Sequence, residues 1–265
     1  MNEFEIKENY LFDDLVLLVE LLRDKDKGCP WDKTQTHESI RQNFIEEVYE
    51  AADAIDKKNP EMLEEELGDV LLQILLHAQM SKEEGTFDIS KVIDGICTKL
   101  VLRHPHIFKG TDADTSAKVL KNWEDIKRAE KAQKTGSDAI DDVPASLPPL
   151  MKSQKVQKRA AYVGFDYPSI EYALGDLDSE VRELKEAISR KGDIFEEIGD
   201  LIFSAVNIAR LSEVDAELAL DRACEKFRKR FKEVEKVAEE EKINFENSDI
   251  DTLNYLWEKA KKETK

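Results

Sequence analysis

The chain has 265 residues, and its hydrophobic content of 41% is enough for a packed core in each of two domains of ordinary size. Its 58 acidic and 40 basic residues give a net charge of -18, which repels the phosphates of nucleic acids and anionic membrane surfaces. No apolar run is long enough to span a membrane, and the amino terminus lacks the basic and apolar regions of a signal peptide. The three cysteines are far apart and predict neither a disulfide framework nor a zinc site. We therefore expect a globular cytoplasmic protein without nucleic-acid or membrane partners.

Helical periodicity dominates the first half of the chain, and strand signals are scarce. Asn59 is a candidate N-cap followed by proline at the first helical position, and Thr36 and Asp88 are further candidate N-caps. Gly85 marks the end of one helix. The predicted helices cover residues 3–26, 36–58, 60–83, 88–104 and 116–134.

The segment TGSDAIDDVPASLPP contains three of the chain's seven prolines and no helical period, which makes it the best domain boundary. We therefore predict a first helical domain at residues 1–134, a linker at 135–149 and a second helical domain at 150–265. The predicted fold class is all-α, with two helical bundles in tandem. The predicted helices of the second domain cover residues 150–162, 169–190, 194–212, 215–241 and 249–263.

One set of residue types occurs twice in the same order, about 130 positions apart, with its internal spacing kept. The pattern is E-x-x-E, E-x-x-D, K-x-x-x-R and W-x-x-x-K. In the first half the set is Glu47, Glu50, Glu66, Asp69, Lys99, Arg103, Trp123 and Lys127. In the second half it is Glu180, Glu183, Glu197, Asp200, Lys226, Arg230, Trp257 and Lys261. The self-similarity indicates a duplicated domain, and acids followed by basic residues are typical of a site for a metal bound to a polyphosphate.

The spacing of the acids has a definite meaning on helices, because residues three apart lie on one face. Glu50 precedes the Asn59 turn by nine residues and Glu66 follows Pro60 by six. At about 1.5 Å per residue, both acid pairs should lie at comparable height on antiparallel helices. Four converging carboxylates cannot all stay ionised unless a cation lies among them, and oxygen ligands of this kind suit Mg²⁺ or Mn²⁺. We therefore predict that the eight repeated acids bind metal.

A simpler interpretation places these acids on salt-bridged surface helices, since Asp and Glu make up over a fifth of the chain. The repetition favours the functional interpretation. Tryptophan occurs only three times, yet Trp123 and Trp257 each stand four residues before a lysine and close the two repeats. We assign both tryptophans to the substrate site.

The segments CPWDKTQTHESIRQNFIEEVYEAADAI, EEELGDVL and KLVLRHPHIF resemble the MazG family of nucleoside triphosphate pyrophosphohydrolases. In the second half KRAAYVGFDY, EEIGDLIF and EKFRKRFKEVE resemble the second domain of two-domain MazG proteins. The family signature, EExxE followed by ExxD, is met by Glu46, Glu47, Glu50, Glu66 and Asp69. The resemblance implies proteins of the all-α NTP pyrophosphatase type that are usually dimeric and bind Mg²⁺ through these acids. It also implies cleavage of NTPs and dNTPs to the monophosphate and pyrophosphate, in the service of nucleotide-pool cleaning.

The second half departs from this signature where Ser179 stands at the position equivalent to Glu46. If Glu46 orients water without touching the metal, loss of its counterpart weakens turnover but leaves metal binding. We assign Glu46 a catalytic role on this basis. Either half remains a candidate for the more active one.

Basic residues can neutralise the charge of a leaving pyrophosphate, because phosphoryl transfer depends mostly on positioning and electrostatic stabilisation. Lys99 and Arg103 are i and i+4 on one predicted helix and can both reach one side of the site, and the second half repeats this arrangement. Ion pairing along the helix surface is the alternative. The basic residues assigned to catalysis are Lys99, Arg103, Lys127, Lys226, Arg230 and Lys261.

Two further aromatic residues, Trp31 in C-P-W-D and Phe165 in G-F-D-Y, occupy corresponding places in the two halves and are candidates for stacking on a nucleobase. Core packing is the alternative for both. All four histidines are left outside the site, because turn, cap and ordinary helix contacts explain them equally well.

Two other protein classes are compatible with parts of the pattern. A ferritin-like di-iron bundle needs Glu-x-x-His, and no histidine here has glutamate three positions before it. The other class is a helical protein that binds nucleotides or partners and has one or both sites inactive. Repeated proline and glycine breaks argue against a long coiled coil, but a regulatory half remains open.

Overall fold

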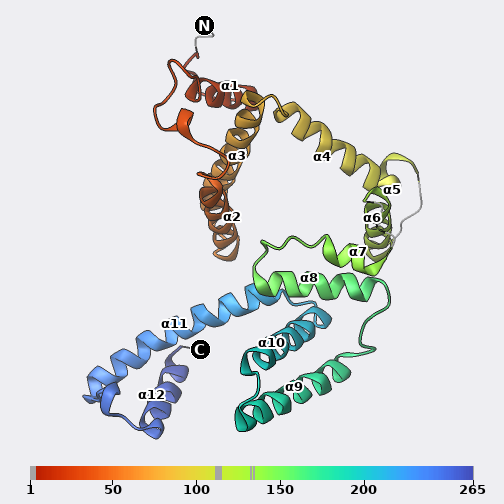
Figure 1. Ribbon diagram of the computed structural model, residues 1–265. Helices are drawn as coiled ribbons and strands as arrows, with labels where there is room; N and C mark the ends of the chain where they lie inside the picture. Colours follow the sequence, from red (N-terminus) through yellow and green to blue (C-terminus); the bar gives the residue numbers. More distant parts are fainter. Residues whose placement is uncertain (1–3, 111–114, 132, 134, 265) are drawn as a thin grey trace. The chain divides into compact units, whose positions relative to one another are not determined.

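The computed structural model describes residues 4–110, 115–131, 133 and 135–264, and its regular elements are all helical, which confirms the all-α class (Figure 1). None of the helices in this described part of the chain combines the length and the apolar character that a membrane span requires. The first elements are α1 (Phe12–Leu22), the 3₁₀ turn η1 (Asp32–Thr34), α2 (Arg41–Asp56), α3 (Pro60–Glu83), α4 (Ile89–Arg103), α5 (Pro105–Phe108) and α6 (Ser116–Glu130). They are followed by α7 (Gly136–Asp141), α8 (Pro149–Tyr162), α9 (Ile170–Arg190), α10 (Ile194–Leu211), α11 (Ala216–Glu241), the 3₁₀ turn η2 (Phe245–Asn247) and α12 (Ile250–Glu263).

Capping residues set the helix starts of the first half. The Asn59 side chain accepts hydrogen bonds from two backbone N–H groups in the first turn of α3, both at 3.2 Å, and Pro60 occupies the first helical position. Asp88 caps α4 in the same way, accepting a hydrogen bond from the Lys91 N–H at 2.9 Å. Gly85 has a φ of 73° in the turn after α3, a conformation that glycine adopts without strain. These predicted boundaries are confirmed.

Two other predicted helix starts are wrong. Residues 4–11 are not helical, and α1 begins where the Asp14 carboxylate accepts a hydrogen bond from the Leu11 N–H at 2.9 Å. Thr36 does accept a hydrogen bond from the Ser39 N–H at 3.2 Å, but this bond stabilises a turn, and α2 begins only at Arg41. A side chain that caps a turn and one that caps a helix have the same sequence pattern.

The predicted linker, residues 135–149, contains the short helix α7, which the sequence analysis missed. Thr135 accepts a hydrogen bond from the Asp138 N–H at 3.1 Å, and the Asp138 carboxylate accepts one from the Thr135 N–H at 2.8 Å. This reciprocal capping stabilises a helix too short to show an apolar period. The chain divides into two compact units, Met1–Lys127 and Arg128–Lys265, so the division falls within α6.

The core of the first unit lies where α1 packs on α3, beside the α2–α3 pair (Figure 1). Val19 of α1 and Leu75 and Leu76 of α3 are at most 3% exposed. Burial of side chains of this size contributes about 1.5–3 kcal/mol each. The two leucines occupy the carboxyl-terminal half of α3, whereas Glu66 and Asp69 lie nearer its start.

One buried cation ties the segment between α1 and α2 to α3. Arg23 is 6% exposed and donates hydrogen bonds from Nε and Nη2 to the Glu83 carboxylate at 3.0 and 2.9 Å. Its Nη1 donates to the backbone carbonyls of Asp32, at 2.6 Å, and Gln35, at 3.2 Å. A bidentate, charge-assisted contact of this kind stabilises the fold and also sets how the two groups are oriented.

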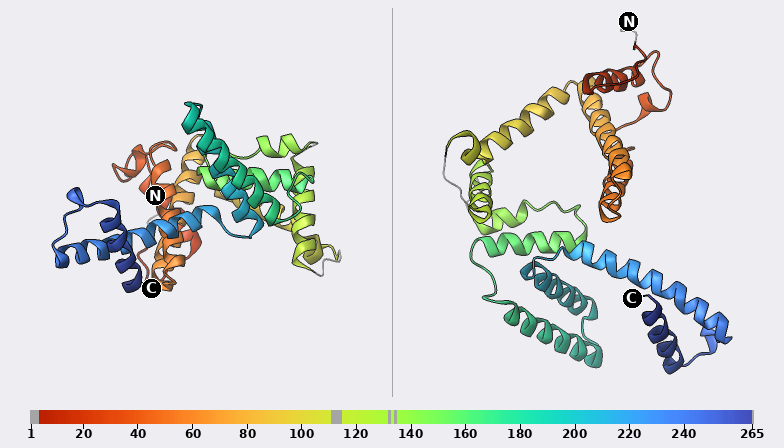
Figure 2. Two further views of the ribbon diagram at one scale, coloured as in Figure 1. Left: turned by 90° about the horizontal axis from the view of Figure 1, so that it is seen from below. Right: turned by 180° about the vertical axis from the view of Figure 1, so that it is seen from behind.

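The second unit contains two helix pairs, α9 with α10 and α11 with α12, which can be followed in both views of Figure 2. Lys191 takes a left-handed conformation with φ of 56° between α9 and α10, and the Asp193 side chain caps α10. Leu256 of α12 is fully buried against Val234 and Val237 of α11. The five helices predicted for this half are confirmed, each within one residue of its predicted limits.

Candidate functional site

Three carboxylates converge between α2 and α3. Glu47 on α2 and Glu66 and Asp69 on α3 each offer one oxygen, and these oxygens lie within 4.8 Å of one another. The α2–α3 hairpin places them together because the two helices pack along their length, as the capped turn at Asn59 requires. The structure therefore brings together three of the four acids predicted for the first half.

The electrostatics of this cluster oppose full ionisation. Burial first, then the charges of Asp69 and Glu50, raise the pKa of Glu47, and a hydrogen bond from Gln73 only partly offsets them. Glu66 is 9% exposed, and its pKa is raised by burial and then by Glu50. Carboxylates with raised pKa values gain stability when a cation compensates their charge.

The two remaining acids of the first signature lie at the edge of the cluster. Glu50 is exposed and is not one of the three converging ligands, although its charge acts on both Glu47 and Glu66. Glu46 is also exposed and accepts a hydrogen bond from Gln42 Nε2 at 3.3 Å. Its place outside the cluster is compatible with a role in orienting water.

A second cluster lies between α9 and α10. Oxygens of Glu180, Glu183 and Glu197 lie within 4.8 Å of one another. Burial first and then Glu183 raise the pKa of both Glu180 and Glu197. Asp200 is exposed and lies outside the three, but its charge contributes to both shifts.

Both clusters have the donor set of a divalent cation site. Each offers three carboxylates from two helices, and Mg²⁺ binds six oxygens at about 2.0–2.1 Å in octahedral geometry. Opposite ligands of such an ion are roughly 4 Å apart, so oxygens gathered within 4.8 Å need only small rotamer changes to share one ion. The all-oxygen chemistry and the raised pKa values both fit Mg²⁺ or Mn²⁺.

Sequence reasoning missed a second set of polar residues beside the second cluster. Asp176, one helical turn before Glu180, accepts a hydrogen bond from the Ser204 hydroxyl at 3.1 Å, and Ser204 is 5% exposed. The Tyr167 hydroxyl also bonds to Asp176; after burial, this contact is the largest cause that raises the Tyr167 pKa. The i, i+4 spacing of Asp176 and Glu180 is a sequence signal that places Asp176 on the helix face of the cluster, but it does not indicate the contacts with Ser204 and Tyr167.

One predicted basic residue of the first half, Arg103, lies beside a tryptophan. The Arg103 guanidinium lies 5.8 Å from the ring centroid of Trp123, and His104 packs edge-on against the same ring. Lys99 is exposed and Lys127 half-buried. The structure gathers this aromatic and basic cluster on α4 and α6, whereas the acids lie on α2 and α3.

The same arrangement recurs in the second half, on α11 and α12. The Arg230 guanidinium lies 5.9 Å from the Trp257 ring centroid, and Phe227 packs against that ring. Lys261 is held by Glu258, with 2.5 Å between its Nζ and the carboxylate. A groove of about 510 Å³ lies beside them, with four cations in its wall. Its lining residues are Arg222, Glu225, Lys226, Lys229, Arg230 and Thr264.

The two residues proposed to stack on a base are both at the surface. Trp31 is 56% exposed and Phe165 is 82% exposed. Core packing, the alternative interpretation, is therefore wrong for both. Their exposure leaves the rings free to meet a planar ligand, and their role in substrate binding stays a prediction.

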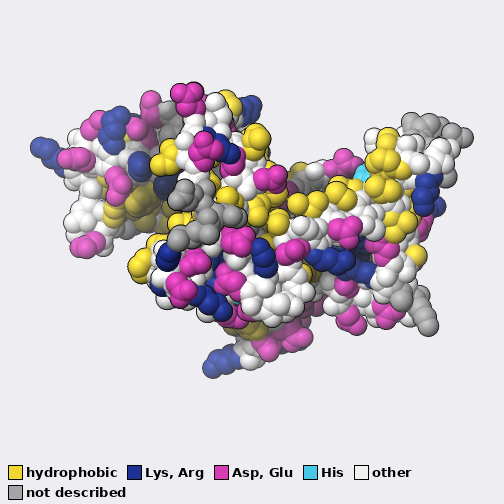
Figure 3. All heavy atoms as spheres, turned by 90° about the horizontal axis from the view of Figure 1, so that it is seen from above, with side chains coloured by type: hydrophobic (Ala, Val, Ile, Leu, Met, Phe, Trp, Pro, Cys, Tyr) yellow, Lys and Arg dark blue, Asp and Glu magenta, His cyan; other side chains and the backbone are white. Residues whose placement is uncertain are grey.

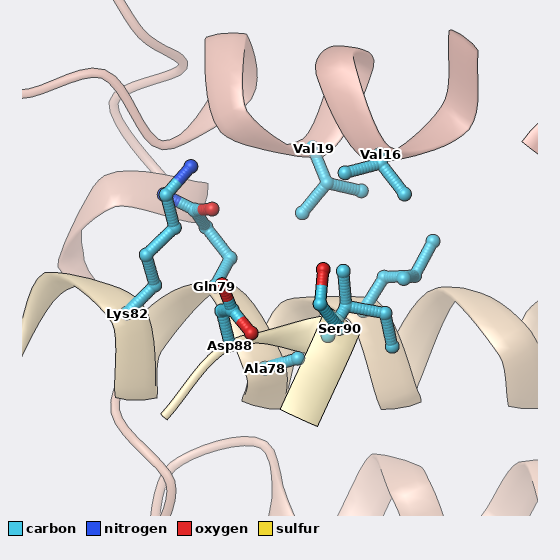
Figure 4. Close-up of a pocket in the computed structure, with 9 residues that line it drawn as sticks. Val16, Val19, Ala78, Gln79, Lys82, Asp88 and Ser90 are labelled. Atoms are coloured by element: carbon cyan, nitrogen blue, oxygen red, sulfur yellow. The ribbon is translucent and has the colours of Figure 1, made fainter. Parts of the chain in front are cut away.

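Two histidines interact, contrary to their interpretation as ordinary helix residues. His37 Nδ1 and His77 Nδ1 are 2.7 Å apart with their rings stacked, and burial followed by the His37 charge lowers the pKa of His77. A cavity of about 150 Å³ between α1 and α3 is a separate feature, lined by core residues such as Val16 and Val19 together with Gln79 (Figure 4). It contains none of the predicted site residues.

Comparison with known proteins finds the same domain twice in this chain. The sequence profile of the MazG nucleotide pyrophosphohydrolase domain matches the chain twice, at residues 35–108 and 169–235, and each match contains one carboxylate cluster. A relative in Escherichia coli K12, called nucleoside triphosphate pyrophosphohydrolase, is 42% identical over 95% of this chain and 97% of its own. One in Thermotoga maritima, called nucleoside triphosphate pyrophosphohydrolase/pyrophosphatase MazG, is 44% identical over 95% and 96%. The protein YabN of Bacillus subtilis is 41% identical over 96% of this chain and 53% of its own. The chain, with two MazG domains in tandem, therefore belongs to the MazG family.

Proposed function

We propose that the protein is a Mg²⁺-dependent nucleoside triphosphate pyrophosphohydrolase that converts NTPs and dNTPs to the monophosphate and pyrophosphate, with Mn²⁺ as a substitute metal. The observation that carries the proposal is the convergence of carboxylates from two helices in both halves of the chain. The names of the Escherichia coli and Thermotoga maritima relatives support the same reaction. Removal of damaged or excess nucleotides from the cytoplasmic pool is the role we propose for it.

The chemistry follows from the residue types at the two clusters. A divalent cation, when bound, supplies charge that polarises phosphate oxygens and lowers the pKa of an attacking water. Glu47, Glu66 and Asp69 would hold that ion in the first half, and Glu46, at the edge of the cluster, would orient the water. In the second half, Glu180, Glu183 and Glu197 would hold the ion in the same way. Ser179 stands there at the position of Glu46.

The basic clusters have the chemistry needed to hold a polyphosphate. The groove beside Trp257 presents guanidinium and ammonium groups in one wall, and such groups bind phosphate oxygens through charge-assisted hydrogen bonds. Lys99, Arg103 and Lys127 supply the corresponding charges in the first half. We propose that they neutralise the leaving pyrophosphate.

A homodimer is part of the proposal. The described helix α4 has no buried residue, and Ile93, Ile96 and Leu100 on one face of it are 42%, 50% and 42% exposed. Figure 3 shows hydrophobic side chains among the charged ones on the face that it presents. An exposed apolar stripe on an amphipathic helix is stabilised when a second copy covers it.

A regulatory function for one half is the second candidate, and Ser179 favours it for the second half. Ser179 Oγ donates a hydrogen bond to Glu183 Oε1 at 3.2 Å, where the signature has an acid. A half that binds metal and nucleotide without turnover would raise the heat stability of the protein on nucleotide binding.

Ion-exchange separation of the products formed from ATP and dNTPs with Mg²⁺ tests the proposed reaction. We expect monophosphate and pyrophosphate in equal amounts. Diphosphate with inorganic phosphate would indicate a different phosphatase. Absence of turnover, with heat stabilisation by nucleotide, would leave the binding function.

A further inference from the structure

The first helix of the second site lacks one acid that the first site has and gains another. At the position of Glu46, the second half has Ser179, and at the position of Asn43 it has Asp176. Counting these positions with the repeated acids, each half has a set of five carboxylates on its helix pair. In the first half these are Glu46, Glu47, Glu50, Glu66 and Asp69, and in the second half Asp176, Glu180, Glu183, Glu197 and Asp200.

Asp176 is anchored from the opposite helix. The Ser204 hydroxyl on α10 donates to Asp176 Oδ2 on α9 at 3.1 Å, and Ser204 is 5% exposed, so the bond lies inside the helix pair. Ser204 follows Asp200 by four residues, and Asp176 precedes Glu180 by four, so the bond lies one turn from the cluster.

The first half has a different contact at the corresponding place. Gln73, the counterpart of Ser204, hydrogen-bonds to the cluster residue Glu47 itself. In the second half Ser204 is too short for that contact and holds Asp176 instead, while Tyr167 donates a second hydrogen bond to Asp176. Two donors fix one carboxylate whose remaining lone pairs are free to accept hydrogen bonds. Its charge also acts on Glu180.

We propose that Asp176 is a positioning residue of the second site and supplies there the fifth carboxylate that Glu46 supplies in the first. Asp176 lies a turn away from the converging oxygens, held on α9 by Ser204 and Tyr167. From this position it accepts a hydrogen bond from water at the site and keeps that water oriented. The catalytic part of this inference rests on the proposed hydrolysis. The part that concerns metal affinity rests on the carboxylate cluster alone.

The test uses the full chain carrying Glu47→Gln, which disables the first cluster and leaves the second as the only complete one. In this background Asp176→Asn removes the charge but keeps an oxygen that accepts from Ser204. Asp178→Asn is the matched control, because Asp178 is an exposed carboxylate on another face of α9. Three quantities are measured for each variant: kcat and KM for ATP, the Kd of Mn²⁺ for nucleotide-free protein by electron paramagnetic resonance, and the thermal midpoint.

We expect Asp176→Asn to lower kcat about 10-fold and to weaken Mn²⁺ binding about 10-fold, the lower end of the roughly 10- to 100-fold range found when residues behind metal ligands are changed. KM and the thermal midpoint should stay near those of the parent, and Asp178→Asn should change none of the three. Adding Ser179→Glu to Asp176→Asn returns the fifth carboxylate to the position that it has in the first half. The protein that carries Ser179→Glu and Asp176→Asn in the Glu47→Gln background should recover most of the lost kcat.

Two results would overturn the inference. One is an unchanged kcat and Mn²⁺ Kd in Asp176→Asn. The other is a fall in kcat that matches a fall in thermal midpoint and is reproduced by Ser204→Ala, which indicates a purely structural clamp. If the Glu47→Gln background does not hydrolyse ATP, the proposed activity of the second half fails separately. The Mn²⁺ titration then still decides whether Asp176 contributes to the site.

Discussion

Glu47 on α2 and Asp69 on α3 bring carboxylate oxygens within 4.8 Å of each other across the helix pair, and the charge of Asp69 raises the pKa of Glu47. Two like charges at this separation repel, so the folded protein holds this cluster at a cost in stability. A site that is unfavourable when empty binds a cation more strongly than a surface pair of acids does. This relationship links the stability of the protein to its proposed function.

The first prediction follows from that cost. Glu47→Gln should raise the thermal midpoint of the metal-free protein, by about 2 °C, because it removes a repelling charge. It should also lower the activity of the first half about 100-fold or more, because one of three converging ligands is lost. Differential scanning calorimetry in EDTA measures the first effect. Glu64→Gln, at an exposed acid on the facing helix α3, is the control and should do neither.

The second prediction concerns pH. The pKa values of Glu47, Glu66, Glu180 and Glu197 are all raised above the ordinary value of 4.5. The folded protein therefore binds protons at these carboxylates more tightly than the unfolded chain does. The free energy of unfolding should fall as pH rises above 4.5, and below pH 4.5 these groups should not lower it.

Magnesium should reverse that loss only where the acids are ionised. We expect 5 mM Mg²⁺ (about the concentration that saturates a millimolar site) to raise the thermal midpoint clearly at pH 7.5 and hardly at all at pH 4.5. Calorimetry at a series of pH values, in Mg²⁺-free and Mg²⁺-containing buffers, measures the difference. An equal increment at both pH values would mean that the metal binds elsewhere.

The basic groove of the second half gives a third prediction. Arg230 lies over Trp257, and its Nε is buried without a hydrogen-bond partner among the described residues. Arg230→Ala should raise KM for ATP about 10-fold or more, the size expected for one charge-assisted hydrogen bond. Arg228 is exposed on the same helix and paired with Glu225, so Arg228→Ala should leave KM within about twofold. Equal effects of the two substitutions would indicate general charge attraction instead of a defined phosphate contact.

The packing of α11 against α12 gives a fourth prediction. Leu256 is fully buried, so Leu256→Ala should lower the free energy of unfolding of the second unit by about 2–5 kcal/mol. Leu220 on α11 is 53% exposed, and Leu220→Ala should cost less than about 0.5 kcal/mol. Urea unfolding followed by circular dichroism compares them. Similar losses for both would contradict the assignment of the core.

Capping residues and periodic acids were the most predictable features of this chain. Asn59 and Asp88 each act within one turn, so local sequence decides them, and the helices of the second half agree with their predicted limits within one residue. The convergence of Glu47 with Glu66 followed from the length of two helices around one capped turn.

Features that depend on contacts between helices were less predictable. The sequence did not reveal that Arg103 and Arg230 cluster with tryptophans on different helices from the acids, because spacing fixes a helix face but not the element that packs against it. The bond between Asp176 and Ser204 joins residues 28 positions apart, and neither residue belongs to the repeated pattern. Helix α7 is stabilised by a reciprocal cap in a segment whose composition indicates a loop.

We propose the two carboxylate clusters as the hydrolytic sites of this chain. Initial rates of pyrophosphate release from ATP, measured with Mg²⁺ for the wild type, Glu47→Gln, Glu180→Gln and the double variant, test this proposal most directly. We expect each single variant to lose the contribution of its own half and the double variant to release no pyrophosphate. A double variant that is folded by circular dichroism and retains more than about a tenth of the wild-type rate, against the 100-fold or greater loss expected for a missing ligand, would contradict it.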